Sequence, residues 1–159
     1  MPESLRSRWQ RFLWNLFPAY RGTGGRIRYI SADQREIRIE LPLSWRTRNY
    51  VGTIYGGSMY GCLDPLMMVM LIRALGPEYV VWDKAASIRF LKPGRTTLHC
   101  RIVVEDAELE AIRRALETER SVDRMYVHEL ADAQGVVHAR VEKMIYIRRK
   151  DAVRGAATG

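Results

Sequence analysis

The sequence predicts an α+β domain in which one curved, mainly antiparallel sheet wraps around a long central helix. Apolar and polar residues alternate with period two in about six segments, as in strands with one buried face. Most of these segments are joined by short turns, which pair neighbouring strands antiparallel. The longest apolar run, within residues 49–76, has the length of a helix, and an apolar helix needs a concave sheet to bury it.

Composition indicates one globular domain. The chain has 159 residues, of which 47% are hydrophobic, enough for a single core over residues 1–159. Cys62 and Cys100 both lie in apolar contexts, which fits a reducing, cytoplasmic location rather than a disulfide framework. Neither has a Cys or His at metal-ligand spacing, so we expect no metal and no other cofactor. The three histidines are expected to be ordinary strand residues: His99, His128 and His138.

The charge and the apolar runs limit the classes of partner. A formal net charge of +8 favours an anionic partner or simply an arginine-rich surface. No recognition helix or aromatic ribonucleoprotein motif supports nucleic-acid binding. The run that begins at Leu63 ends at Arg73, short of the roughly 18 residues that a membrane span needs. Early arginines interrupt the first hydrophobic stretch, so we expect no secretory signal.

An extra helix is predicted at the N-terminus, over residues 4–17. Its apolar residues fall on one face at helical spacing: Leu5, Trp9, Phe12, Leu13, Leu16 and Phe17. Ser4 is the expected N-cap and Pro18 the expected stop. A basic amphipathic helix of this kind can lie on a membrane surface. We favour the alternative, that it packs on its own domain.

The strands and the second surface helix follow from periodicity and turn residues. The glycine-rich segment 21–25 is expected to be a turn, and the domain core is expected to cover residues 25–148. The predicted strands cover residues 27–29, 37–41, 79–91, 97–104, 122–130 and 136–147, and a polar surface helix covers 106–120. Residues 150–159 have no core-forming side chains and are expected to form a flexible tail.

Asp64 is the residue that most directly suggests chemistry. It lies among apolar residues such as Leu63 and Leu66, where a carboxylate must be paired, protonated or solvated. Such a group is a candidate general base or nucleophile, the interpretation that we favour. Alternatively, Asp64 is an N-cap and Pro65 the first helical residue. If the helix instead starts near Gly57, Pro65 lies in its interior and bends it.

The segment from Asn49 to Asp64 resembles the signature of hotdog-fold acyl-CoA thioesterases of the phenylacetate-degradation and 4-hydroxybenzoyl-CoA type. Asn49 corresponds to their asparagine, Tyr55-Gly56-Gly57 to their His-Gly-Gly, and Asp64 to the acid on the helix. The segment SIRFLKPGRTTLHCRI resembles the strand-turn-strand that follows in the same fold. Closer still is a poorly characterised branch that carries an N-terminal helix and lacks the histidine.

The resemblance implies a thioesterase that hydrolyses an acyl-CoA-like thioester at the interface of a homodimer or of a dimer of dimers. In that scheme the Gly57 N–H holds the thioester carbonyl, and Asp64 activates water or attacks directly. Asn49 either orients the water or caps its own loop. Tyr55 either orients the substrate or only packs, because a phenol is not a base near neutral pH. A Gly-Gly pair by itself is also compatible with an ordinary turn.

Further residues are candidates for binding substrate. Gly56 lets a ligand approach the backbone, Ser58 follows it closely, and Met67 and Met68 either line an adaptable acyl pocket or fill the core. The cations expected to bind the phosphates of coenzyme A are Arg46, Arg48, Arg89, Lys92 and Arg95. Lys84 is expected to pair with Asp83 or Asp64. The alternative function is a non-catalytic acyl- or lipid-binding protein of the same fold.

Overall fold

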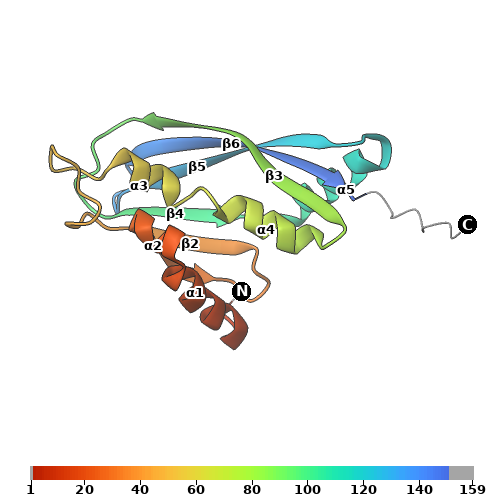
Figure 1. Ribbon diagram of the computed structural model, residues 1–159, viewed down its shortest axis with the longest axis horizontal. Coiled ribbons are helices and arrows are strands. Elements are labelled where there is room, and N and C mark those ends of the chain that lie inside the picture. The colour runs from red at the N-terminus through yellow and green to blue at the C-terminus, as the bar shows by residue number, and fades with distance from the viewer. Residues whose placement is uncertain (1, 151–159) are drawn as a thin grey trace, which may run out of the picture.

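The structure, a computed structural model, describes residues 2–150 and has one six-stranded sheet with all strand pairs antiparallel. The strand order is β1-β2-β4-β5-β6-β3, so β1 and β3 form the two edges (Figure 1). The strands are β1 (Arg26–Ile30), β2 (Glu36–Leu41), β3 (Tyr79–Phe90), β4 (Leu98–Val103), β5 (Val122–Ala131) and β6 (Val137–Arg149). The α+β class and the antiparallel sheet are confirmed. The part of the predicted tail from residue 151 onward lies outside the described residues.

The central helix lies against the sheet and is broken in the middle. Its halves are α3 (Gly56–Gly61) and α4 (Leu66–Leu75), joined by a turn over residues 62–65. Pro65 has no N–H, so it cannot complete the helical hydrogen bond to the Gly61 carbonyl. The helix therefore starts at the glycines and breaks before the proline, and its second half begins at Leu66. The alternative in which Asp64 is the N-cap and Pro65 the first helical residue is wrong in its details, because Pro65 is the N-cap of α4, Leu66 is its first residue, and no side chain caps it.

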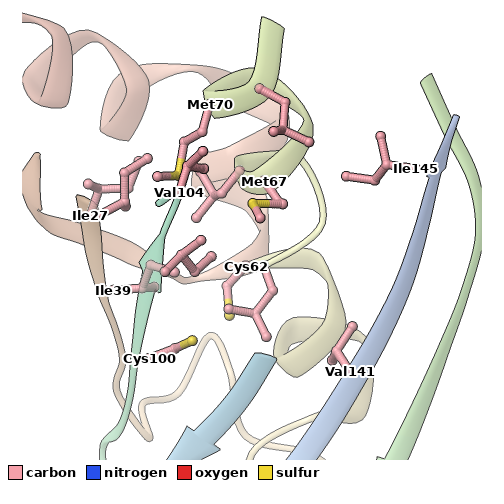
Figure 2. Close-up of a cluster of buried hydrophobic side chains, with 14 of the residues drawn as sticks. Ile27, Ile39, Cys62, Met67, Met70, Cys100, Val104, Val141 and Ile145 are labelled. Carbon is pink, nitrogen blue, oxygen red and sulfur yellow. The ribbon is translucent and has the colours of Figure 1, made fainter. Parts of the chain in front are cut away.

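Side chains from the central helix and from the inner face of the sheet form the core. Cys62, Met67 and Met70 pack in this core with Ile39 on β2 and Val141 on β6 (Figure 2). Both cysteines are free and buried, and burial raises the pKa of the Cys100 thiol to about 12. Their contribution is therefore apolar packing rather than thiol chemistry.

The central segment also has the composition of a membrane span. From Gly56 to Leu75 it is long and apolar enough to cross a bilayer by length and composition alone. Half of its most apolar window is buried inside the domain. That burial is the property of a core helix, so this segment gives only weak support for a membrane span.

The predicted surface helix is present as α5 (Asp106–Thr118), at one end of the molecule and well apart from α1 (Figure 1). Leu109, Ile112 and Leu116, its predicted apolar stripe, are buried. Glu108 accepts hydrogen bonds from Arg124 and Tyr126 of β5 and joins the helix to the sheet. The Arg124 guanidinium lowers the pKa of Glu108 despite the opposing effect of burial.

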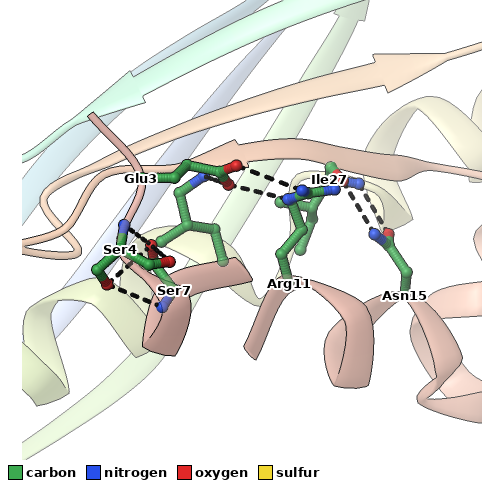
Figure 3. Close-up of polar contacts among 7 residues, drawn as sticks. Glu3, Ser4, Ser7, Arg11, Asn15 and Ile27 are labelled. Atoms are coloured by element: carbon green, nitrogen blue, oxygen red, sulfur yellow. Dashed lines mark hydrogen bonds and ion pairs between the residues drawn. The ribbon is translucent and has the colours of Figure 1, made fainter. Parts of the chain in front are cut away.

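The N-terminal helix packs on the domain through its polar side. Helix α1 (Leu5–Leu16) begins at Ser4, which forms a capping box with Ser7. Asn15 donates to the Ile27 carbonyl at 2.9 Å and accepts from the Ile27 N–H at 2.8 Å (Figure 3). Glu3 pairs with Arg11 at 2.9 Å on the same side (Figure 3). Glu3 also accepts from the Ile30 N–H at 3.0 Å, so Asn15 and Glu3 together tie the helix to strand β1.

The apolar face of α1 consequently points outward, which differs from the packing that its sequence suggests. The six predicted apolar residues are 48–83% exposed. Pro18 ends α1 as predicted but also starts α2 (Pro18–Thr23). The predicted turn over residues 21–25 is therefore wrong in its first half. It is confined to the end of α2, where Gly24 has a φ of 82°, which glycine adopts without strain.

Candidate functional site

Asp64 lies in the turn that interrupts the central helix. Its side chain is 43% exposed, and its Oδ1 accepts a hydrogen bond from the Tyr60 hydroxyl at 2.6 Å. Burial raises the pKa of the Tyr60 hydroxyl, and the neighbouring Asp64 carboxylate adds to the shift. Tyr60 is therefore a neutral donor to the carboxylate. Within residues 2–150, Oδ2 of Asp64 accepts no hydrogen bond, so this oxygen is open to water or substrate.

Lys143 of β6 is the counter-ion of Asp64. Its side chain is fully buried, and its Nζ lies 3.1 Å from Asp64 Oδ1 and 2.9 Å from Asp83 Oδ2 on β3. Nζ also donates to the backbone carbonyl of Asp64. A buried ammonium needs such partners, because an unpaired one is costly in an apolar interior. Lys143 thus fixes both the carboxylate and the turn that carries it.

Sequence reasoning missed Lys143 and assigned its role to Lys84. The prediction for Lys84 is wrong: its Nζ pairs with Asp123 at 2.5 Å, on the exposed side of the sheet. A signal for Lys143 was present, because it alternates with Val141 and Ile145, which are fully buried. A lysine at an inward position of a strand must have an acidic partner inside the fold.

An apolar cavity of about 600 Å³ opens beside Asp64, between the N-terminal helices and α4. Leu13 of α1, Ala19 of α2 and Phe17 between the two helices line one side of it. Pro65 and Val69 of the central segment line the other side. Asp64 and Arg73 are its two charged lining residues. The cavity brings a carboxylate with a free oxygen to the edge of an apolar space.

The glycines at the start of α3 lie under two aromatic rings. A Cβ atom added to Gly56 would lie 2.7 Å from the Phe90 ring, and one added to Gly57 would lie 2.4 Å from the Tyr55 ring. Both rings belong to side chains that are more than half exposed. The first N–H groups of a helix have no helical acceptor, and the structure gives those of Gly56 and Gly57 no partner among the described residues. These N–H groups are available to a ligand.

Asn49 caps its own loop. Its Oδ1 accepts from the N–H groups of Val51 and Thr53 at 3.1 and 3.0 Å, and its Nδ2 donates to the Thr53 hydroxyl at 2.9 Å. Of the two predicted roles for this side chain, the loop cap is the one that the hydrogen bonds support. The bonds leave one Nδ2 hydrogen free.

A second cavity, of about 410 Å³, connects this loop to the start of α3. Asn49, Gly56 and Lys92 line it, together with Met59 and Phe90. Two residues predicted from the Asn49–Asp64 segment and a third, Lys92, predicted from a distant one are thus brought together. Asp64 lines the other cavity and does not line this one.

The remaining predicted binding residues lie elsewhere. Ser58 is buried in α3, Met67 is a core residue, and Met68 is half-buried against the core. Met59, which sequence reasoning did not single out, lines the second cavity. Arg89 and Arg95 are exposed on the segments that flank Lys92.

The histidines have structural surroundings. His138 lies between the Pro93 carbonyl and Asp132 Oδ2, each at 3.0 Å, and joins two turns. His128 is buried near Lys143, and burial with that positive charge lowers its pKa to about 4. No group of three or more His, Cys, Asp or Glu side chains in the described part of the chain is placed to hold a metal ion.

Known structures share this architecture at low sequence identity. A protein of unknown function from Pseudomonas aeruginosa, described as a probable thioesterase, superposes with a TM-score of 0.80 at 16% identity, over 94% of this chain and 99% of that one. A thioesterase from Haemophilus influenzae has a TM-score of 0.64 at 11% identity, over 96% of both chains. A mutant thioesterase from Pseudomonas aeruginosa has a TM-score of 0.66 at 11% identity, over 89% and 94%. The chain therefore has the hotdog fold of these structures.

Sequence comparison identifies the family without a function. No curated protein matches the chain. A family model described as a domain of unknown function, DUF4442, matches residues 6–147, which include nearly all of the N-terminal helix and of the sheet. The chain belongs to the DUF4442 family.

Proposed function

We propose that the protein is a thioesterase that hydrolyses an acyl-CoA-like thioester. The observation that carries the proposal is the partly exposed Asp64 carboxylate, whose Oδ1 is held by Tyr60 and Lys143 while Oδ2 is free. A positioned carboxylate with one free oxygen is suited to take a proton from water. The shared fold with structures named as thioesterases supports the same reaction class.

The chemistry is a hydrolysis in which Asp64 acts as general base. Asp64 Oδ2 takes a proton from a water molecule, and the water oxygen bonds to the thioester carbonyl carbon. The carbonyl oxygen gains negative charge, which the Gly57 N–H stabilises by hydrogen bonding. When the tetrahedral intermediate collapses, the C–S bond breaks and the thiolate leaves with the bonding electrons. Asp64 returns the proton to the thiolate or to solvent.

The proposed site forms between two subunits, in a dimer or a dimer of dimers. Asp64 lines one cavity while Gly56 and Asn49 line another, so one chain does not bring them into a common cavity. Strand β3 is an edge strand of 12 residues, and its exposed side chains include Trp82 and Phe90. Long exposed edges of this kind are sites of strand pairing. Pairing through β3 would let Asp64 of one chain face the glycines of the other.

The cations around the second cavity are suited to the coenzyme. Lys92 lines this cavity with Asn49, and Arg89 and Arg95 are exposed on either side of Lys92 in the sequence. Arginine binds phosphate oxygens with a fork of donors, and lysine binds them as a point charge. We therefore place the coenzyme A phosphates outside this cavity.

Release of free thiol from a panel of acyl-CoA thioesters tests the proposal. We expect the parent to turn over at least one substrate, and we expect Asp64→Asn to lower the rate of that turnover. If no substrate in the panel is turned over, the catalytic proposal fails.

A non-catalytic acyl-binding protein is the second candidate. Tyr55 replaces the histidine of the resembled thioesterases, and the Asn49 side chain is occupied by its own loop. Tight binding of acyl-CoA without thiol release would favour this candidate. Binding with thiol release would contradict it.

A further inference from the structure

The cavity between the N-terminal helices and α4 has the properties of a site for an apolar chain. Its volume of about 600 Å³ lies within the range of small-molecule sites. Its apolar lining comes from two sides, with Leu13 and Phe17 from the N-terminal segment and Leu66 and Val69 from the central segment. From Leu66 to Arg73 the helical wall extends roughly 10 Å at 1.5 Å per residue, so the cavity follows the helix axis.

Most polar groups of the lining are already bonded inside the protein. The Tyr20 hydroxyl donates to the Cys62 carbonyl at 3.2 Å, and the Thr23 hydroxyl donates to the Tyr20 carbonyl at 2.7 Å. Arg73 donates to Gln34 Oε1 at 2.6 Å and lies over the Trp14 ring at 4.8 Å. A ligand in this cavity therefore meets apolar surface along its length.

Asp64 is the lining carboxylate, its Oδ2 accepts no hydrogen bond among the described residues, and it lies where the cavity meets the break in the helix. A ligand suited to these surroundings has a long apolar part and a single polar reacting group at one end. A thioester of a linear aliphatic acid has this form. An aromatic acyl group is shorter than the helical wall of roughly 10 Å and would contact only part of it.

We infer that the acyl chain of the thioester lies in this cavity, between α1–α2 and α4 of the subunit that supplies Asp64. The inference rests on the proposed thioesterase function and adds the substrate class, a linear aliphatic acyl group of medium or greater length. The N-terminal helices then form one wall of the substrate site. The coenzyme part lies outside the cavity, toward the glycines at the start of α3 in the partner subunit.

Binding of S-alkyl-CoA thioethers, which cannot be hydrolysed, tests this placement separately from catalysis. Calorimetry on the full chain with S-butyl-, S-octyl- and S-dodecyl-CoA is expected to show tighter binding with length. Each buried methylene contributes about four-fold to affinity, so the octyl compound should bind at least ten-fold tighter than the butyl compound. Equal affinity for all three would overturn the inference.

Variants that fill the cavity test whether the gain in affinity with chain length arises there. Ala19→Trp on the exposed α2 wall and Val69→Phe on the opposite wall should remove the gain from octyl and dodecyl chains. Ala107→Trp, on the exposed surface of α5, is the matched control and should keep that gain. If both cavity variants keep the same dependence on chain length as the control, the chain lies elsewhere and the inference is wrong.

The proposed function can fail separately from this inference. Chain-length-dependent thioether binding that both cavity variants abolish, without release of thiol from any acyl-CoA, would support the placement and contradict the hydrolysis. Hydrolysis whose rate depends neither on the cavity variants nor on chain length would support the thioesterase function and contradict the placement of the acyl chain. Thiol release and thioether binding measured on the same preparations distinguish the two.

Discussion

Lys143 Nζ lies 3.1 Å from Oδ1 of Asp64 and also donates to the Asp64 backbone carbonyl, so one ammonium holds both the carboxylate and its turn. The two residues are 79 positions apart in the chain. Lys143 comes from the inner face of β6, whereas Asp64 comes from the break that Pro65 makes in the central helix. The break exposes a carbonyl and a carboxylate at the same place, and the lysine satisfies both.

Replacing Lys143 should destabilise the fold. Lys143→Met leaves the Asp64 and Asp83 carboxylates without their shared counter-charge, and Asp83 Oδ1 is buried without any partner in the described residues. Since both carboxylates are partly solvated, we expect a loss of about 2–3 kcal/mol in the free energy of unfolding. Denaturant titration measures it. Lys84→Met removes an exposed ion pair and should change stability by less than about 1 kcal/mol; equal losses in the two variants would contradict this account.

The fold could be predicted from the sequence because its signals are local. Period-two alternation located the six strands, and turn residues located the two hairpins β1–β2 and β5–β6. The expectation that short turns pair most neighbouring strands is wrong for β3 and β4, which do not pair with each other although only a short segment joins them. The N-cap at Ser4 is equally local, since Ser4 and Ser7 satisfy each other within one turn.

The site could be predicted only in part because it depends on contacts between distant segments. Asp64 was identified by its apolar neighbours, but its counter-ion lies on another element, and Lys84 is nearer in sequence although it points to the other face. Similarly, the apolar face of α1 predicts burial there, whereas Asn15 and Glu3 tie the polar side to β1. Local periodicity does not specify which face a neighbouring strand will bind.

The stability should fall as the pH is lowered from 7 to 4, and His128 should account for part of the fall. Burial and the Lys143 charge lower the pKa of His128 to about 4, below the ordinary value of 6.5. Between these values the unfolded chain binds a proton that the folded chain does not, so stability is full above about pH 6.5 and is lost toward pH 4. The shift corresponds to about 3 kcal/mol at most.

Chemical denaturation across this pH range checks the prediction. His128→Leu should flatten the pH dependence between pH 4 and 6.5, because the neutral side chain has no proton to gain. His99→Leu, at an exposed position of β4, is the control and should leave the profile as it is in the parent. An unchanged profile in His128→Leu would show that the group responsible is another one.

A methyl group at Gly57 should impair activity more than stability. The added Cβ would lie 2.4 Å from the ring of Tyr55, so this ring must move, and it can do so because the side chain is 58% exposed. A displaced ring and a shifted N–H should lower kcat/KM for thioester hydrolysis by about 100-fold, with a small change in Tm. Gly22→Ala meets no atom within 4 Å and is the control. Activity of Gly57→Ala equal to that of Gly22→Ala would argue against a role for this N–H.

Asn15 should be important for holding α1 on the sheet. Its amide makes two hydrogen bonds with the Ile27 backbone, so Asn15→Ala leaves a strand N–H and a carbonyl without these partners (Figure 3). We expect a loss of about 1–3 kcal/mol and faster cleavage of the N-terminal helix in limited proteolysis. Gln10→Ala, in the same helix and without such bonds among the described residues, should resemble the parent. Equal protection of the two variants would show that other contacts hold the helix.

The most direct test of the proposed function is thiol release by the parent and by Asp64→Asn, with medium-chain acyl-CoA as substrate. The amide keeps the size of the carboxylate but cannot take a proton from water, so kcat should fall by about 100-fold or more. Asp123→Asn, which removes the exposed partner of Lys84, should leave kcat at the parent value. A kcat for Asp64→Asn equal to that of the parent would contradict the assignment of Asp64 as the general base.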